Sequence, residues 1–195
     1  MAVLAIRKTW RLCGIAFPLF YYFNQRIAVI FFVLSFLGIF IIIEILRFLA
    51  PPFNERLFRI FKYILKEKEK KSLLTTTWFL LSIFLSVVLF RKDIAIAAIL
   101  FLIFGDTASA FFGLRFGSRK LIGNRSLEGS LAFLLTCLTI GIIMHFTQVS
   151  LSWPVLIFGA LAATLSELLP WPMDDNFTIA LFSGIMMTFM WKFVG

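Results

Sequence analysis

The feature that most constrains this chain is the recurrence of apolar runs along its whole length. These runs reach the roughly 17–25 residues that a helix needs to cross a bilayer. The 195-residue chain is 61% hydrophobic, whereas soluble domains contain about 45–50% apolar residues. Its mean hydropathy is +0.99. So little sequence remains for a soluble part that we expect a single integral membrane domain over residues 1–195.

Seven of these runs predict transmembrane helices, because a chain inside a bilayer must satisfy its backbone hydrogen bonds within each segment. The expected spans are Leu12 to Phe23, Ile27 to Leu49, Leu73 to Phe90, Ile94 to Phe112, Gly129 to Phe146, Trp153 to Leu169 and Phe177 to Val194. The Pro51-Pro52 pair ends the second span, because proline lacks the amide donor and restricts the residue before it. The expected fold class is an all-α, polytopic transmembrane helical bundle.

Between the second and third expected spans lies a charged segment, Asn54 to Lys71. Its apolar residues recur at the spacing of one helix face, and lysines and glutamates occupy the other positions. The apolar positions are Leu57, Phe58, Phe61, Ile64 and Leu65. This pattern predicts an amphipathic helix that lies at the membrane interface. A lid that gates access to a substrate is the alternative interpretation.

The basic residues are distributed unevenly between the two sides of the expected bundle. Fifteen of the nineteen lysines and arginines fall on one side. They are Arg7, Lys8, Arg11, the eight from Arg47 to Lys71, Arg115, Arg119, Lys120 and Arg125. By the positive-inside rule this side, which includes the N-terminus, is cytoplasmic. Because the net charge of +9 is spread over short loops, it argues against nucleic-acid binding.

Six of the ten acidic residues lie near the cytoplasmic ends of the expected spans or in the loop after the sixth. They are Glu44, Asp106, Glu128, Glu167, Asp174 and Asp175. Carboxylates inside a bilayer cost about 2.5–3.5 kcal/mol each on insertion scales, so they usually serve a function. With the basic residues on the same side, they form a set that can hold a divalent cation and a polyphosphate.

Some of these acids have simpler local explanations. Glu44 is one turn away from Arg47 and can pair with it. Glu128 can complement the positive end of a helix that Ser126 caps, and the two acids after the sixth span can be ordinary loop charges. Asp106 is different, because it directly follows the apolar run AIAAILFLIFG with no basic residue beside it.

The segment GDTASAFFGLRFGSRKLIGNRSLEGS, from Gly105 to Ser130, combines several of these features. Ser109, Gly113 and Gly117 continue a repeat of small residues every four positions. Small residues at this spacing let transmembrane helices approach closely, which is one explanation of the repeat. It does not account for the adjacent carboxylate or for the loop that follows.

That loop contains the parts of a phosphate-binding site. Its basic residues are Arg119, Lys120 and Arg125, and Gly117 and Gly123 lie on either side of the first two. Mobile glycines, basic side chains and a helix N-terminus can together bind an anion. The string GxxxxGK[ST] is absent, so this is not a Walker A loop. Orientation signals in membrane proteins give similar loops.

The whole pattern resembles the signature of the membrane lipid kinases that include dolichol kinase, phytol kinase and the CTP-dependent diacylglycerol kinase. That family is distantly related to phosphatidate cytidylyltransferase. The matching residues in the central segment are Gly105, Asp106, Gly113, Gly117, Lys120 and the string Ser126-Leu127-Glu128-Gly129-Ser130. Those outside it are Arg7, Lys8, Glu44, Glu167, Asp175 and Asn176.

Two positions depart from the family pattern. Arg125 stands where the family usually has lysine, a mild change because arginine also binds phosphate. Arg11 stands where the family commonly has histidine, which argues against a histidine-based role near the N-terminus. The only histidine, His145, lies toward the outer end of the fifth span, and we interpret it as structural.

The resemblance implies transfer of the terminal phosphoryl group of a nucleotide, with CTP as the expected donor, to a lipid alcohol at the cytoplasmic interface. The alcohol would be diacylglycerol, a polyprenol or a phytol-like alcohol, and homo-oligomerisation is left open. The resemblance implies Mg²⁺ or Mn²⁺ bound by Asp106, Glu167 and Asp175. It implies phosphate contacts from Gly113, Gly117, Arg119, Lys120, Arg125, Ser126 and Asn176. Asp106 and Glu128 are the candidate catalytic residues, either of which would accept the hydroxyl proton.

Two other functions remain as alternatives. A phosphatidate cytidylyltransferase would make CDP-diacylglycerol, but the carboxyl-terminal signature of that family, with its lysine and histidine, is absent. A small membrane transporter could use the intramembrane acids as a coupling-ion site. No inverted repeat of interrupted helices supports the transporter.

Overall fold

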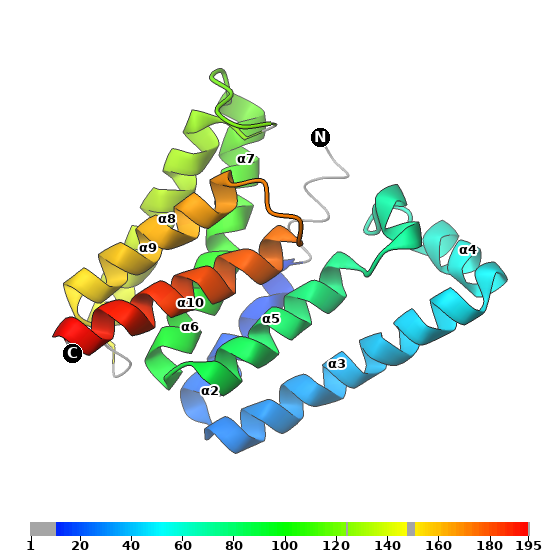
Figure 1. Cartoon of the computed structure of the whole chain (residues 1–195), viewed down its shortest axis with the longest axis horizontal. Coiled ribbons are helices and arrows are strands. Elements are labelled where there is room, and N and C mark those ends of the chain that lie inside the picture. Colours follow the sequence, from blue (N-terminus) through cyan, green and yellow to red (C-terminus); the bar gives the residue numbers. More distant parts are fainter. Residues whose placement is uncertain (1–10, 124, 148–150, 195) are drawn as a thin grey trace.

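The computed structural model of the chain describes residues 11–123, 125–147 and 151–194, which fold into helices joined by short connections (Figure 1). The elements are η1 (Cys13–Ile15), α2 (Ala16–Phe23), α3 (Arg26–Leu49), α4 (Pro51–Ile60), η2 (Glu67–Lys71), α5 (Thr75–Leu89), α6 (Lys92–Leu100), η3 (Phe101–Gly105), α7 (Asp106–Phe116), α8 (Leu127–His145), α9 (Trp153–Leu168) and α10 (Asp175–Val194). No strand occurs in the described residues. The expected all-α fold class is confirmed.

Each of the seven expected spans corresponds to a helical segment in the described part of the chain. Four segments are long and apolar enough to cross a membrane, namely α3, α8, α10 and the continuous run Lys92–Phe116 that comprises α6, η3 and α7. The run Cys13–Phe23 and the helices α5 and α9 are apolar but shorter. Length and composition therefore agree with a helical membrane bundle.

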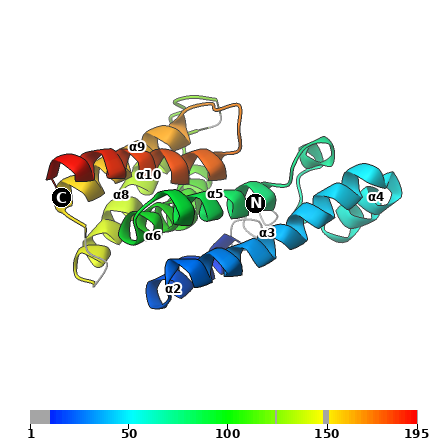
Figure 2. The same cartoon turned by 60° about the horizontal axis from the view of Figure 1, so that its bottom comes forward.

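The run formed by α6 and η3 is the centre of the bundle. Ile94 to Ile99 and Phe101 to Ile103 are at most 4% exposed. A helix that is apolar on all sides is buried inside a larger bundle, and α2, α5, α8 and α10 pack around this one. In contrast, α3 lies at the edge, against α2 and α5 (Figures 1 and 2). Its outer face carries exposed apolar side chains such as Phe31, which suit contact with lipid.

The amphipathic helix is shorter than the sequence predicted. It is the helix α4, which ends at Ile60, and the chain then turns and continues as the short 3-10 helix η2. An uninterrupted helix from Asn54 to Lys70 would separate its two ends by about 24 Å. Instead, Asn54 Nδ2 donates to the Lys70 carbonyl at 3.1 Å. The chain folds back because Phe58 and Leu65 are buried together in a small apolar cluster.

The predicted pair of Glu44 and Arg47 is present and nearly inaccessible to solvent. The two side chains form an ion pair and are 6% and 0% exposed. Arg47 Nη2 also donates to the Glu69 carbonyl at 2.6 Å. Glu44 Oε1 accepts from Leu74 N at 2.6 Å and from Thr77 Oγ1 at 2.8 Å. These bonds join α3 to η2 and to the start of α5, so the pair holds the fold-back in place.

The opposite end of the bundle, with few basic residues, is closed by bonds from side chains to backbone. Arg26 Nη2 donates to the Phe90 carbonyl at 2.6 Å. Lys92 Nζ donates to the carbonyls of Tyr22 and Asn24 at 2.9 and 3.1 Å. The basic residues at this end therefore connect helices to one another.

The only histidine in the sequence has a structural position, as predicted. His145 Nδ1 lies 3.1 Å from the carbonyl oxygen of Leu151. Its ring packs on Trp153 with the ring centroids 4.4 Å apart. His145 thus connects the end of α8 to the start of α9, at the end of the bundle remote from the acidic cluster described next.

Candidate active site

Asp106 stands where a π-helical turn meets a regular helix. The continuous run from α6 to α7 is π-helical at Phe101–Gly105, directly before Asp106. A π turn adds a residue to one turn of the helix and often occurs at functional sites. It changes the face on which the following residues emerge. Asp106 is 2% exposed and forms an ion pair with Arg11, two residues before η1.

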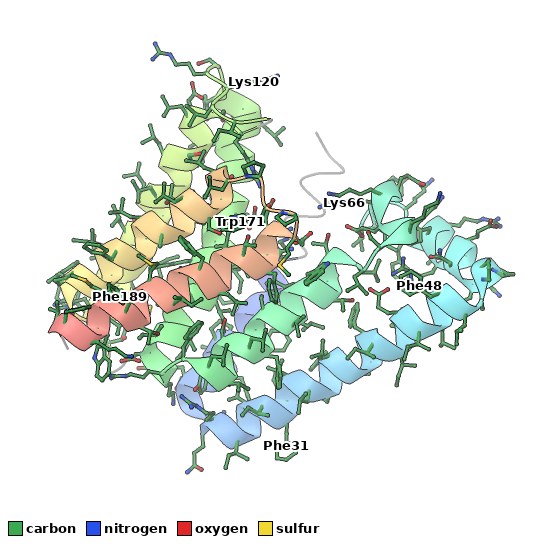
Figure 3. All side chains as sticks on the ribbon, in the orientation of Figure 1. Phe31, Phe48, Lys66, Lys120, Trp171 and Phe189 are labelled. Carbon is green, nitrogen blue, oxygen red and sulfur yellow. The ribbon has the colours of Figure 1, made fainter. Side chains whose placement is uncertain are left out.

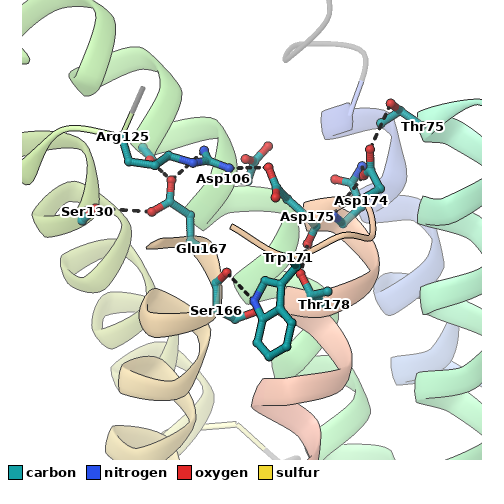
Figure 4. A network of polar contacts seen from close by, with 12 residues as sticks. Thr75, Asp106, Arg125, Ser130, Ser166, Glu167, Trp171, Asp174, Asp175 and Thr178 are labelled. Atoms are coloured by element: carbon teal, nitrogen blue, oxygen red, sulfur yellow. Dashed lines mark hydrogen bonds and ion pairs between the residues drawn. The ribbon is translucent and has the colours of Figure 1, made fainter. Parts of the chain in front are cut away.

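Glu167, near the end of α9, is bonded to three other parts of the structure (Figure 4). Its carboxylate accepts from Ser109 Oγ of α7 at 2.9 Å and from Ser130 Oγ of α8 at 3.3 Å. The guanidinium of Arg125, in the loop before α8, lies 2.7 Å from the same carboxylate. Glu167 is 1% exposed. A buried charge of this kind is tolerated because it is paired and hydrogen-bonded.

Arg125 connects Glu167 to a second carboxylate. While its Nη1 pairs with Glu167, its Nη2 pairs with Asp175 at the start of α10. The side chains of Arg125 and Asp175 are 29% and 40% exposed, whereas that of Glu167 is 0% exposed. A bridge that is partly open to solvent can exchange one of its carboxylates for another anion, such as a phosphate.

Asp174 and Asn176 flank this carboxylate at the beginning of α10. Asp174 Oδ1 accepts from the backbone N–H of Asn176 at 3.1 Å and from its Nδ2 at 2.5 Å. The Oδ1 atom of Asn176 is buried and has no hydrogen-bond partner among the described residues. An amide oxygen in this position can accept a hydrogen bond from a ligand or coordinate a cation.

Three connections that are distant in sequence meet around these residues. The pair of Arg125 and Asp175 joins the loop before α8 to the turn before α10. Thr75 Oγ1 lies 2.5 Å from Glu69 Oε1 and 3.3 Å from Asp174 Oδ2, which joins the segment before α5 to that turn. All three connections belong to the side of the bundle on which the sequence places most basic residues.

The described residues of the basic loop form a hairpin, and the mobility of its glycines stays a prediction. Leu121 N donates to the Arg125 carbonyl at 2.9 Å. Gly123 has a φ of 56°, a conformation that glycine adopts without strain. Arg119 and Lys120 are exposed, and Figure 3 shows Lys120 at the outer end of the molecule. Of the three predicted phosphate-binding cations, only Arg125 forms ion pairs with the carboxylates Glu167 and Asp175 in the described structure.

Glu128 and Ser126 organise this hairpin and the helix after it. Glu128 Oε1 accepts from Ser118 Oγ at 2.5 Å and from Arg119 N at 3.3 Å. Ser126 Oγ accepts from Gly129 N at 3.2 Å, so Ser126 is the N-cap of α8, as expected. The catalytic role of Glu128 and the phosphate-binding role of Ser126 stay predictions.

The repeat of small residues forms the contact between α7 and α8. Cβ atoms at Gly113 and Gly117 would lie 3.1 and 2.8 Å from Ser126 Oγ, at the N-cap of α8. On the facing helix, a Cβ atom at Gly129 would lie 2.9 Å from the Ser109 carbonyl oxygen. The predicted close packing is confirmed. Nucleotide binding by Gly113 and Gly117 stays a prediction.

The three predicted metal ligands are divided between two arginines. Asp106 pairs with Arg11, while Glu167 and Asp175 both pair with Arg125. No group of three or more His, Cys, Asp or Glu residues arranged to hold a metal ion occurs in the described part of the chain. Carboxylate oxygens are nevertheless the donors that Mg²⁺ and Mn²⁺ prefer. The donor chemistry therefore fits such a cation, and a metal-binding role stays a prediction.

The structure adds residues that the sequence analysis did not assign to the site. The sequence offered a reason to consider Arg11, since it stands where the lipid-kinase family commonly has histidine. It offered one for Ser130 too, as the last residue of the matching string, whereas Ser109 was interpreted only as a small residue. Thr75 opens an apolar helix and gave no local signal. The family match also includes Arg7 and Lys8, which lie outside the described residues.

Burial lowers the pKa values of two basic groups beside the site, Arg11 and Lys66. Burial lowers the pKa of the Arg11 guanidinium below its ordinary value, and the negative charges of Asp174 and Asp175 oppose that effect. Burial also lowers the pKa of Lys66, and the positive charge of Arg11 lowers it further. Arg11 therefore lies within electrostatic reach of both the turn before α10 and the segment before α5.

Fold and site together define the class of the protein. It is an all-α helical membrane protein with a cluster of arginines and carboxylates at one end of its bundle. It is 28% identical over 176 residues to CTP-dependent diacylglycerol kinase 1 of Saccharomyces cerevisiae, covering 75% of this chain and 58% of that kinase. It is 25% identical to the kinase of the same name from Schizosaccharomyces pombe, covering 74% of this chain and 72% of that kinase.

A further relative is an uncharacterized protein of Rickettsia prowazekii, 29% identical over 83% of this chain and 80% of its own length. No family model and no solved structure matches the chain. The similarity to the two kinases supports a phosphotransferase that acts on an alcohol group. A relation to dolichol kinase, phytol kinase or phosphatidate cytidylyltransferase stays a prediction.

Proposed function

We propose that this chain is a lipid kinase that transfers the terminal phosphoryl group of CTP to the hydroxyl of a membrane lipid alcohol. Diacylglycerol is the acceptor that its relatives favour. The observation that carries the proposal is the bridge from Arg125 to Glu167 and Asp175, partly open to solvent, in a chain similar to CTP-dependent diacylglycerol kinases. Polyprenols and phytol-like alcohols are further acceptors to test.

The chemistry suits residues of this kind. Phosphoryl transfer depends on positioning and on neutralising charge, with little covalent work for the protein. Arg125 would bind the phosphates, and Arg119 and Lys120 would approach them from the hairpin. Asn176, whose Oδ1 is buried without a partner in the described residues, would orient the nucleotide or its cation.

The paired charges also explain how a nucleotide with its cation could enter. In the described structure the three predicted metal ligands are each paired with an arginine. A nucleotide phosphate would replace Asp175 or Glu167 on Arg125, and the released carboxylate together with Asp106 would hold Mg²⁺ or Mn²⁺. The phosphate would then pair with Arg125 and the cation with the released carboxylate, so neither of these two charges is left alone. The cation would supply charge neutralisation at the transferring phosphoryl group.

We place the N-terminus and the site on the cytoplasmic side, on the strength of the asymmetric distribution of basic residues. Single cysteines at Arg119 and Asp174, introduced into a cysteine-free variant, should react with an impermeant maleimide from the same side of sealed vesicles. A cysteine at Arg91, in the turn before α6, should react only from the other side. Labelling of the first two positions from opposite sides would overturn the shared site.

Isotope-labelled CTP tests the reaction itself. Purified protein should move a γ-phosphate label from CTP into diacylglycerol and leave an α-phosphate label in the aqueous products. In a parallel reaction supplied with phosphatidic acid, an α-label in lipid would instead indicate a cytidylyltransferase. Neither label in any lipid alcohol, under conditions where the protein is folded, would refute the proposed function.

A further inference from the structure

A cavity of about 340 Å³ lies between α2, α3 and α5, and it adjoins the arginine–carboxylate cluster at Arg11. Its walls are mainly apolar, from Phe17, Phe32, Phe36, Phe40 and Phe79. A volume of this size is within the range of about 300–1,000 Å³ that small-molecule sites occupy. An apolar wall of this composition suits a hydrocarbon chain.

One end of the cavity is polar. Arg11, Lys66, Glu69 and Thr75 line it there. Thr75 Oγ1 and Glu69 Oε1 are 2.5 Å apart, and Glu69 is 4% exposed. These groups offer donors and an acceptor to a hydroxyl group, while the phenylalanines offer only apolar surface.

The polar end of the cavity adjoins the cluster proposed to bind the nucleotide. Arg11 lines the cavity and pairs with Asp106. Thr75 lines the cavity and lies 3.3 Å from Asp174 Oδ2, a contact drawn in Figure 4. A hydroxyl bound at this end would therefore lie next to the phosphate-binding residues.

The cavity also opens to the side of the bundle. Cys13, Ala16 and Phe36 line it and are exposed. Cys13 and Ala16 belong to the N-terminal helical run, and Phe36 to the peripheral helix α3. The exposed lining residues Cys13, Ala16 and Phe36 give an apolar chain in the bilayer a route into the cavity between these helices.

We propose that this cavity binds one hydrocarbon chain of the lipid alcohol and holds its hydroxyl at the Thr75–Glu69 end. The proposal rests on the proposed kinase function for the identity of the acceptor. The polar end suits an alcohol because Thr75 Oγ1 and Glu69 Oε1 can exchange hydrogen bonds with a hydroxyl, while the lateral opening admits a chain already in the membrane. An apolar chain without a hydroxyl would contact the apolar walls but would form no hydrogen bond with the groups at the polar end.

Cys13 reports occupancy directly, because it is exposed in the cavity wall and the other cysteine, Cys137, is buried. In detergent micelles an apolar maleimide should modify Cys13. Dioleoylglycerol at about ten times its dissociation constant should slow that reaction about tenfold. Cys13→Ser, which removes the signal, confirms the site of labelling. No protection by dioleoylglycerol, or equal protection by dioleoylphosphatidylcholine, would overturn the proposal.

Filling the cavity tests its use during turnover. Ala16→Trp should raise the KM for dioleoylglycerol about tenfold, the loss of roughly 1.4 kcal/mol of lipid binding, and leave the KM for CTP unchanged. Leu19→Trp is the matched control, since Leu19 is exposed on the same helix and does not line the cavity. Equal effects of the two variants would refute lipid binding in the cavity and leave the proposed kinase function intact. A wild-type protein without kinase activity would refute the proposed function. The protection of Cys13 by dioleoylglycerol would then test lipid binding in the cavity independently.

Discussion

Two of the arginine–carboxylate clusters in the described structure differ in their access to solvent. In the first, Arg47 and Glu44 have side chains that are 0% and 6% exposed. Asn54 Oδ1 accepts from Arg47 Nε at 3.1 Å, and the pair is also bonded to the Glu69 carbonyl, Leu74 N and Thr77 Oγ1. Because solvent hardly reaches either side chain, an outside anion cannot replace Glu44 without breaking the fold-back that the pair holds.

In the second cluster, Arg125 joins Glu167 to Asp175, and both Arg125 and Asp175 are partly exposed. Glu167 is anchored by two serines, whereas the side of the cluster formed by Asp175 faces solvent. The same pair of residue types thus connects parts of the fold in one place and, in the function we propose, forms an exchangeable site in the other. What distinguishes them is whether another anion can reach the arginine, which local sequence does not reveal.

The largest effect on activity should come from Asp106→Asn. The amide keeps the shape of the side chain but loses the charge that pairs with Arg11 and that would bind Mg²⁺. We expect phosphoryl transfer to be abolished while the protein still elutes as a folded species in detergent. Asp93→Asn is the matched control, because Asp93 is also buried and pairs with Arg91 at the other end of the same helical run. Near-normal turnover of Asp106→Asn would show that the charge of Asp106 is not required for catalysis.

The largest effect on stability should come from Arg47→Met. Breaking a buried pair costs about 3–5 kcal/mol because an uncompensated charge remains, here that of Glu44. Chemical unfolding in detergent should show this loss. Arg91→Met, which breaks a partly exposed pair, should cost less than about 1 kcal/mol. A small effect of Arg47→Met would show that the first cluster is not the structural one.

Arg125→Ala should distinguish the roles of the two clusters most clearly, because it should affect activity more than stability. It should lower kcat/KM about 10- to 100-fold, because charge-assisted bonds to phosphate are worth roughly 1.5–3 kcal/mol. Its effect on unfolding should be smaller than that of Arg47→Met. Arg125→Lys should recover only part of the activity, since a single ammonium cannot bridge two groups as a guanidinium does. Full activity per folded molecule in Arg125→Ala would erase the proposed difference between the clusters.

The smallest expected effect concerns the exposed hairpin. If Lys120 approaches the nucleotide, Lys120→Ala should raise the KM for CTP about tenfold, the loss of one charge-assisted bond. Lys68→Ala, at an exposed position of η2, should change it less than about threefold. Equal, small changes at both positions would show that Lys120 only helps to orient the protein in the membrane.

The sequence by itself determined the helical class and named most of the charged residues that the structure brings together in the candidate site. Apolar runs of spanning length leave no alternative to helices, and all seven expected spans correspond to helical segments. Ser126 as a helix cap and the pair of Glu44 with Arg47 were also predictable, since both depend on residues one turn apart. Short-range spacing translates directly into contact on a helix.

Tertiary structure alone decided which charges meet. The π-helical turn before Asp106 changes the face on which that carboxylate emerges, so helical periodicity could not place it. The end of α4 at Ile60 depends on a buried cluster and on Arg47 bonds to the segment after it. Arg125 reaches two helices whose sequences lie 42 and 50 residues away. Such pairings depend on how whole helices pack, and the hydropathy and spacing of a single segment carry no information about its neighbours in space.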